Sequence, residues 1–256
     1  MSLSQSFLLL LHRKIQKMHS HGIVLRSLRY SDQQVILNVF TEASGTVPFI
    51  VRLPRNGKQG LRASVWQPLA LVDVLWEPRL RMNFQKPQEV TLWQPWHDLP
   101  FQPAKTTMSL FLAEFLSHAL ASEQENGALF DFLVSSLQWL DAAEERYANF
   151  HVVFLLHLSR FLGFLPNVDD WTEGAYFDLQ AASFVRARPA YPFYIEPAEA
   201  ALVQKFLRMD YRSMRAVRLN RNARRRALEL IVLFYRLHIP EFPEIKSLGV
   251  LAEVFE

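Results

Sequence analysis

The side chains that could perform chemistry do not fall into a known catalytic grouping. Gly57-Lys58-Gln59-Gly60 lacks the leading glycine and the serine or threonine of a phosphate-binding loop. The sequence contains neither a Gly-x-Ser-x-Gly nucleophile elbow nor a His-Glu-x-x-His zinc helix. The adjacent acidic pairs Glu144-Glu145 and Asp169-Asp170 would point apart on a helix, so they suit acid–base chemistry poorly. We therefore expect no catalytic residue, no cofactor and a protein that is not an enzyme.

Metal binding is also not indicated by the sequence. The chain has no cysteine, which excludes disulfides, a thiolate zinc site and a cysteine nucleophile. His19 and His21 could touch a metal, but two histidines near an N-terminus are usually solvated. His151 and His157 lie in an apolar stretch, where a hydrogen-bonded core position is the commoner role. We expect no metal ligand.

Binding features are stronger, and the first of them is a set of cations in the first hundred residues. Arginine and lysine side chains can follow a phosphate backbone, while aromatic rings stack on unpaired bases. The predicted DNA-contacting cations are Arg26, Arg29, Arg52, Arg55, Lys58, Arg62, Arg79, Arg81 and Lys86. The aromatic candidates are Tyr30, Phe49, Trp66 and Trp76. Each of these aromatic residues would equally suit the core of a small β-barrel.

A second basic zone lies near the C-terminus. Its arginines are Arg208, Arg212, Arg215, Arg218, Arg221, Arg224, Arg225 and Arg226. Steps of three and four keep several of them on one face if the stretch is helical, and arginine suits bidentate phosphate contacts. From this zone we predict DNA contacts by Arg212, Arg215, Arg221 and Arg225. The alternative is salt bridging to the acidic segment 101–204, whose charge is equal and opposite, and we expect part of the zone to be used in that way.

The distribution of charge is more informative than the net charge of +3. Residues 1–100 carry a net charge of +6, residues 101–204 carry −8, and residues 205–226 carry +8. Two basic zones separated by an acidic one suggest a polyanion that is held at more than one place. The alternative is that long helices simply solvate their outer faces with arginine.

The elements that must position these residues change character near residue 97. Five runs rich in β-branched and aromatic residues predict strands at 21–30, 33–42, 46–53, 67–77 and 89–93, with Ala43-Ser44-Gly45 as a tight hairpin connection. Five short strands suit an oligonucleotide-binding (OB-fold) β-barrel. We therefore predict an α+β protein with an N-terminal extension over 1–19, an OB-fold domain over 20–97 and an all-helical C-terminal domain over 98–256.

Helical periodicity dominates the second half of the chain. Met108, Phe111, Leu112 and Phe115 share one helix face, and Asn126 is a candidate N-cap for the next helix. Asn149 is the candidate cap of a third helix that is apolar almost all round, which is typical of a buried central helix. Further helices are predicted from Pro197 and over 222–238, while the segment 165–195 reads as irregular.

The N-terminus carries no convincing targeting signal. The apolar run from Phe7 to Leu11 is too short to span a bilayer, and no basic stretch precedes it. We expect a cytoplasmic protein that does not contact membranes.

A series of short segments, taken in order, resembles the RecO family of recombination mediators. The series begins with Gly22-Ile23-Val24-Leu25, Tyr30-Ser31-Asp32, Phe40-Thr41-Glu42 and Ser44-Gly45. It continues with Gln67-Pro68-Leu69, Phe111 to Phe115 and Ser159-Arg160-Phe161-Leu162-Gly163, and it ends with Lys246-Ser247-Leu248 and Val250-Leu251. The resemblance covers about residues 20–256. No single segment is specific, but the ordered set is.

The resemblance carries functional implications. It implies binding of single- and double-stranded DNA and annealing of complementary strands. It also implies action with RecR to load RecA, an indirect partner, onto DNA coated by single-strand-binding protein. Relatives hold the acidic, Phe-ending tail of that coating protein in a groove of the helical domain.

Two departures from the family pattern affect these implications. Many relatives bind zinc with four cysteines where this chain runs from Pro166 to Arg188, so packing must hold that segment here. Some relatives place arginine at the start of the central helix for tail binding, where this chain has Phe150-His151-Val152-Val153. His151, Leu155 and Arg160 are the predicted substitutes for binding the partner tail.

These observations favour a non-enzymatic recombination mediator in DNA repair. The alternative is an adaptor whose basic surfaces bind only acidic protein tails, without direct DNA binding. A metal-dependent nuclease is a distant third hypothesis because no carboxylate cluster supports it.

Overall fold

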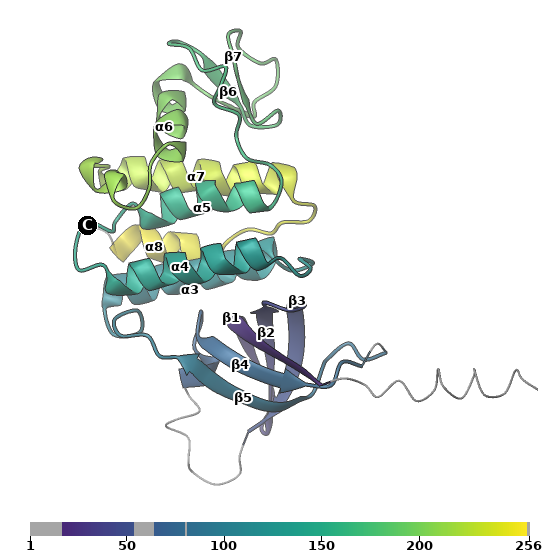
Figure 1. Ribbon diagram of the computed structural model, residues 1–256. Coiled ribbons are helices and arrows are strands. Elements are labelled where there is room, and N and C mark those ends of the chain that lie inside the picture. Colours follow the sequence, from purple (N-terminus) through teal and green to yellow (C-terminus); the bar gives the residue numbers. More distant parts are fainter. Residues whose placement is uncertain (1–16, 54–63, 80, 255–256) are drawn as a thin grey trace, which may run out of the picture. The chain divides into compact units, whose positions relative to one another are not determined.

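The computed structural model describes residues 17–53, 64–79 and 81–254 of the chain, and it has an N-terminal antiparallel sheet followed by helices (Figure 1). The predicted α+β class is confirmed. The chain divides into two compact units. The first contains the described residues of Met1–Pro95 together with Leu120–Phe130, and the second contains Trp96–Ala119 and the described residues of Asp131–Glu256.

Five strands form the sheet of the first unit. They are β1 (Met18–Ser31), β2 (Gln34–Thr41), β3 (Gly45–Arg52), β4 (Leu71–Trp76) and β5 (Pro87–Gln94). Their order in the sheet is β3-β2-β1-β4-β5, with every ladder antiparallel. The predicted strands contribute to one core cluster, in which side chains such as Val24, Leu37 and Val72 are fully buried.

The edge strands β3 and β5 are not joined by a ladder in the described part of the chain. Gln85, just before β5, instead forms an isolated parallel bridge with Phe49 of β3. The Ile50 N–H donates to the Gln85 carbonyl at 2.9 Å, and the Gln85 N–H donates to the Pro48 carbonyl at 2.8 Å. A short η1 turn (Ser64–Trp66) precedes β4, and its Val65 lies in the core.

Helices dominate the second unit. They are α3 (Pro103–Ala119), α4 (Gly127–Ala142, which begins in the first unit), α5 (Phe150–Phe161), α6 (Pro197–Leu207), α7 (Arg221–His238) and α8 (Ser247–Val254). A short η2 turn (Ser213–Ala216) lies between α6 and α7. The helix α5 is buried along nearly its whole length, as its apolar sequence predicts, and it runs beside α7 (Figure 1). Tyr235 of α7 fixes this pairing because its hydroxyl donates to the Leu155 carbonyl at 2.7 Å.

The segment between α5 and α6 corrects the prediction of an irregular stretch in an all-helical domain. It forms a three-stranded sheet in the order β7-β6-β8, from β6 (Tyr176–Asp178), β7 (Ser183–Val185) and β8 (Tyr194–Ile195). Strands of two or three residues are too short for alternation to reveal them in the sequence. Phe177 and Phe184 are buried, and their rings meet edge to face at 5.0 Å.

The predicted caps have mixed outcomes. Asn126 accepts a hydrogen bond from the Leu129 N–H at 3.1 Å, so its capping role is confirmed. Asn149 precedes α5 as predicted, but its side chain makes no capping hydrogen bond. It is held by other groups, because its amide donates to the Val217 carbonyl at 2.7 Å.

The start of the first strand lies within the predicted N-terminal extension, because β1 begins at Met18. The remainder of that extension, residues 1–16, lies outside the described residues. No helix in the described part of the chain is long and apolar enough to span a membrane.

Candidate nucleic-acid and partner-binding surfaces

A hollow of about 710 Å³ on the first unit brings together three of the predicted binding residues, Arg52, Trp66 and Lys86. Its walls come from β3, η1, β5 and the start of β2. The lining residues are Gln34, Ile50, Val51, Arg52, Val65, Trp66, Lys86, Pro87, Gln88, Glu89, Val90 and Thr91. We call this hollow the sheet groove. It combines cations, an aromatic ring and amide groups, which are the chemical types that a single strand of nucleic acid requires.

The fold positions the two cations of the sheet groove at strand ends. Arg52 ends β3, opposite Gln34 in the ladder, and Lys86 directly precedes β5. Both side chains are exposed, which leaves their charges available to a ligand. Trp66 is half-buried and packs against the apolar core, so part of its ring area is accessible. Glu89 is the one acidic residue among those that line the groove.

The other predicted cations of the first unit lie on two extensions of the sheet. Arg26 and Arg29 are exposed on the outer half of β1, together with Leu28 and Tyr30, and Arg29 lies 3.4 Å from Asp32. Arg79 and Arg81 are exposed in the connection that leads to Lys86. The remaining three predicted cations, Arg55, Lys58 and Arg62, lie outside the described residues.

The structure separates the aromatic candidates that the sequence left open. Phe49 and Trp76 are fully buried, and their rings meet edge to face at 5.4 Å, so they are core residues. Tyr30 is 61% exposed, and Trp66 keeps part of its surface accessible. Only the latter two can offer a ring to a base.

The C-terminal basic zone does not form the single helical face that its spacing suggested. It runs from the end of α6 through η2 and an extended link into α7, so its arginines are spread over several elements. Arg226 pairs with Glu199 at 3.2 Å and Arg225 pairs with Glu229 at 2.9 Å. The expectation that part of the zone forms salt bridges is confirmed. Arg212, Arg215 and Arg221 are exposed.

Comparison with known proteins decides the family of this chain. Residues 15–96 match the family model described as "Recombination protein O N terminal". Residues 100–248 match the model described as "Recombination protein O C terminal".

The chain belongs to the RecO family.

Relatives support this assignment over nearly the whole length. The chain is 40% identical to a protein named DNA repair protein RecO from Phocaeicola vulgatus, over 91% of this chain and 97% of the relative. It is 42% identical to the protein of that name from Bacteroides fragilis, over 92% and 98%. The protein of that name from Porphyromonas gingivalis is 31% identical, over 93% and 98%.

The residues predicted to hold a partner's tail in this RecO-family chain are only partly accessible. His151 and Leu155 are fully buried in α5. Neither side chain has exposed surface in this structure, which gives direct tail contacts by these two residues no support, and the contacts stay a prediction. Burial also lowers the pKa of His151 to about 3, with a smaller contribution from the nearby Arg224, so this imidazole is neutral near pH 7. Arg160 is exposed, and its role stays a prediction.

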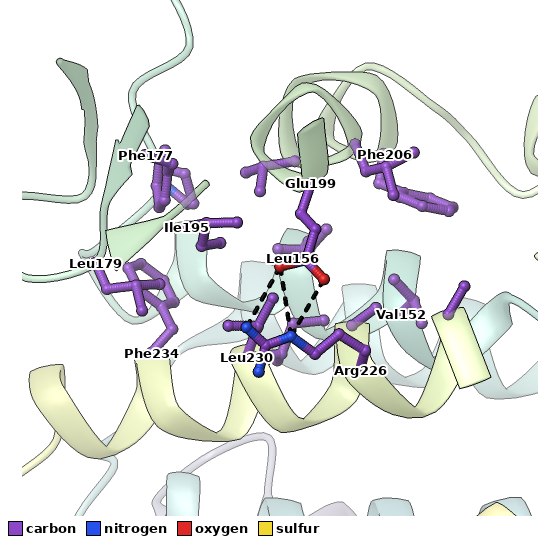
Figure 2. Close-up of a pocket in the computed structure, with 16 residues that line it drawn as sticks. Val152, Leu156, Phe177, Leu179, Ile195, Glu199, Phe206, Arg226, Leu230 and Phe234 are labelled. Carbon is purple, nitrogen blue, oxygen red and sulfur yellow. Dashed lines mark hydrogen bonds and ion pairs between the residues drawn. The ribbon is translucent and has the colours of Figure 1, made fainter. Parts of the chain in front are cut away.

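An apolar pocket next to α5 is a better place for a partner's apolar side chain. It has a volume of about 170 Å³ and lies among α5, α6, α7 and the three-stranded sheet. Figure 2 shows Leu156, Phe177, Ile195 and Leu230 around it, with Glu199 and Arg226 joined across it by dashed lines. Arg226 of α7 and Glu199 of α6 also line the pocket, so a salt bridge lies beside its apolar walls.

Proposed function

We propose that this RecO-family chain is a DNA-repair protein that binds single- and double-stranded DNA and anneals complementary strands without catalysing a reaction. The observation that carries the proposal is the sheet groove, where exposed Arg52 and Lys86 flank the half-buried ring of Trp66. Annealing would follow because neutralising the phosphates of two strands lowers their mutual repulsion. The names of the relatives and the family match support the repair role.

The proposal includes an OB-fold domain over residues 20–97 and a partner-binding domain over residues 98–256. Closure of the five-stranded sheet into a barrel is supported by the two hydrogen bonds of Gln85 to β3, since they draw the segment before β5 to the opposite edge strand. The predicted DNA contacts remain part of the proposal, including those of Arg55, Lys58 and Arg62.

The partners that we propose are RecR, single-strand-binding protein and, indirectly, RecA, in the bacterial cytoplasm and nucleoid. The apolar pocket beside Arg226 would suit the Phe-ending acidic tail of the coating protein, because a tail carboxylate can compete with Glu199 for the guanidinium. In a peptide-binding titration, Glu199→Gln should strengthen binding of such a tail and Arg226→Gln should weaken it.

Charge reversal in the sheet groove tests DNA binding. We expect Arg52→Glu/Lys86→Glu to weaken binding of labelled single-stranded DNA by about tenfold or more at physiological salt. The slope of log affinity against log salt should fall by about 1.4, which corresponds to two lost contacts with single-strand phosphates. Fluorescence anisotropy across a salt series measures both quantities.

The matched control is Arg186→Glu/Arg236→Glu, which makes the same change in net charge at exposed positions after β7 and in α7. Equal losses in the two double variants would mean that only overall charge matters, and would refute the groove. A weak response to salt in the unmodified protein would favour an adaptor that binds acidic tails alone. Incubation of DNA with the protein and magnesium tests for nuclease activity, and cleavage would contradict the non-enzymatic assignment.

A further inference from the structure

A second, smaller hollow in the helical unit is surrounded by four arginines. It has a volume of about 190 Å³ and lies where α5 begins. Its lining consists of Arg146, Ala148, Asn149, Arg215, Val217, Arg218, Leu219 and Arg224. The described residues in this lining include no acidic side chain, whereas the sheet groove contains Glu89. We call this hollow the arginine hollow.

Segments that are distant in sequence supply these arginines. Arg146 comes from the connection between α4 and α5, where its φ is 57°. Arg215 belongs to η2, Arg218 to the extended link after it, and Arg224 to the first turns of α7. The convergence therefore depends on the fold and is not a by-product of a charged helical face.

The base of the arginine hollow is built around a buried amide. Asn149 is 5% exposed, and its oxygen accepts a hydrogen bond from Nε of Arg224 at 3.3 Å. Its nitrogen donates to the Val217 carbonyl, and Nη2 of Arg224 donates to the Leu219 carbonyl at 2.9 Å. These bonds fix one guanidinium against neutral acceptors, and desolvation lowers the pKa of Arg224. Asn149 forms this arrangement in place of capping α5.

The carboxylates near the arginine hollow lie outside its described lining. Arg225 and Arg226 each contact a carboxylate within 3.2 Å. Arg146 is 3.9 Å from the exposed Glu145, and the guanidinium of Arg215 lies 5.4 Å from the centre of the Trp139 ring. Like charges gathered without a lining carboxylate repel one another, so an anion in the hollow would stabilise the arrangement.

We propose that the arginine hollow binds a single phosphate group of a nucleic-acid strand. A phosphate offers several oxygens in a compact tetrahedron, and guanidinium forks bind such oxygens in pairs. The hollow exceeds the space needed for one water several-fold, which leaves room for this group. The start of α5 adds the positive end of a helix dipole. This inference rests on the proposed DNA-binding function but concerns a different surface.

Inorganic phosphate is the first probe because it tests the hollow without DNA. The variant is Arg146→Asn/Arg218→Gln, since asparagine tolerates the positive φ at position 146 and both arginines are exposed. Calorimetric titration at constant ionic strength should show saturable phosphate binding to the unmodified chain. The double variant should bind phosphate about tenfold more weakly. Arg186→Gln/Arg236→Gln removes two exposed charges elsewhere and should leave phosphate affinity unchanged.

Single-stranded DNA is the second probe. The Arg146→Asn/Arg218→Gln variant should lower the salt slope by about 0.7, the value for one single-strand phosphate, and added phosphate should compete with the strand. Absence of phosphate binding, or equal loss in the control variant, would overturn the site. Phosphate binding with an unchanged salt slope would assign the site to free phosphate and overturn the nucleic-acid ligand. Displacement of phosphate by an Asp/Glu-rich peptide but not by DNA would also overturn the nucleic-acid ligand. If Arg52→Glu/Lys86→Glu leaves DNA affinity unchanged while the arginine hollow still binds phosphate, the sheet groove is rejected and the arginine hollow is not.

Discussion

Among the described glycines, Gly45 has the tightest surroundings. Its φ is +66°, and a Cβ at this position would lie 2.1 Å from the Glu123 carbonyl oxygen. The same segment is held by Thr46, whose N–H donates to the Glu123 carbonyl at 3.0 Å and whose hydroxyl donates to the Leu120 carbonyl at 2.6 Å. The turn between β2 and β3 therefore packs directly against the 120–130 segment of its own unit.

Gly45→Ala should lower the free energy of unfolding by roughly 3 kcal/mol, because backbone strain adds to a clash with main-chain atoms. The control is Gly174→Ala, where φ is also positive, at +81°, but no atom lies within 4 Å of the added Cβ. That change should cost about 1 kcal/mol. Urea unfolding of both variants measures the difference, and equal losses would show that the contact with Glu123 is unimportant.

His151 gives the protein a defined sensitivity to acid. The unfolded histidine has a pKa near 6.5, whereas burial lowers the folded value to about 3. The unfolded state therefore binds the proton first, and the contribution of neutral His151 to stability is complete above pH 6.5. It is lost progressively as the pH falls toward 3.

His151→Leu should remove this sensitivity. Between pH 7 and pH 4 the unmodified protein should lose about 3 kcal/mol more stability than the variant. Carboxylates whose pKa is lowered by hydrogen bonds, such as Glu114, contribute to acid sensitivity equally in both proteins, so the difference isolates the imidazole. Parallel stability curves from denaturant titrations at each pH would contradict the assignment.

Residue identity alone could not separate core from surface aromatics. Phe49 and Trp66 both lie among apolar residues of the first unit, yet Phe49 is buried and Trp66 is half-buried. The difference arises from the strand register that buries Phe49 and from the η1 turn, a three-residue element without a periodic signal.

At the scale of elements, α8 depends on a single carboxylate of α3. Glu114 accepts hydrogen bonds from the N–H groups of Lys246 at 2.9 Å and Ser247 at 2.8 Å, and from the Ser247 hydroxyl. It therefore acts as an N-cap supplied by another helix. These hydrogen bonds with Lys246 and Ser247 hold the pKa of Glu114 below its usual value, although burial opposes them.

Glu114→Ala should release α8 while leaving the rest of the fold intact. We expect amide hydrogen exchange over 247–254 to accelerate about tenfold or more, because local opening no longer breaks these bonds. Glu144→Ala, at an exposed position outside the helices, serves as the control and should leave exchange in α8 unchanged. Uniform acceleration in all helices of the Glu114 variant would instead indicate global destabilisation.

The elements were predictable where they are long. The residue patterns located five strands and the major helices within a few residues. Four of these strands have eight or more residues and the helices α3 to α7 have eleven or more, so their patterns repeat several times. The strands β6, β7 and β8 repeat no pattern, and their pairing is decided by tertiary contacts such as that between Phe177 and Phe184.

At the scale of the whole molecule, the charge zones indicated candidate binding surfaces but not how the fold builds them. Arg52 and Lys86 were predictable as cations, and the sheet then placed them around one groove. Arg146 was not predictable as a binding residue, because it belongs to an acidic stretch and joins Arg215, Arg218 and Arg224 only through folding. Convergence of distant segments leaves no local signal in the sequence.

The three-stranded sheet of β6, β7 and β8 bears on the conditions under which the protein keeps its fold. Its centre consists of Phe177, Phe184 and Ile195 in a chain that lacks cysteine. It therefore contains no thiolate that could lose a bound metal or be oxidised. We expect EDTA to leave the melting temperature unchanged and mild peroxide to leave this segment resistant to proteases. A repair factor of this kind would stay assembled during metal starvation and under the oxidants that break chromosomes.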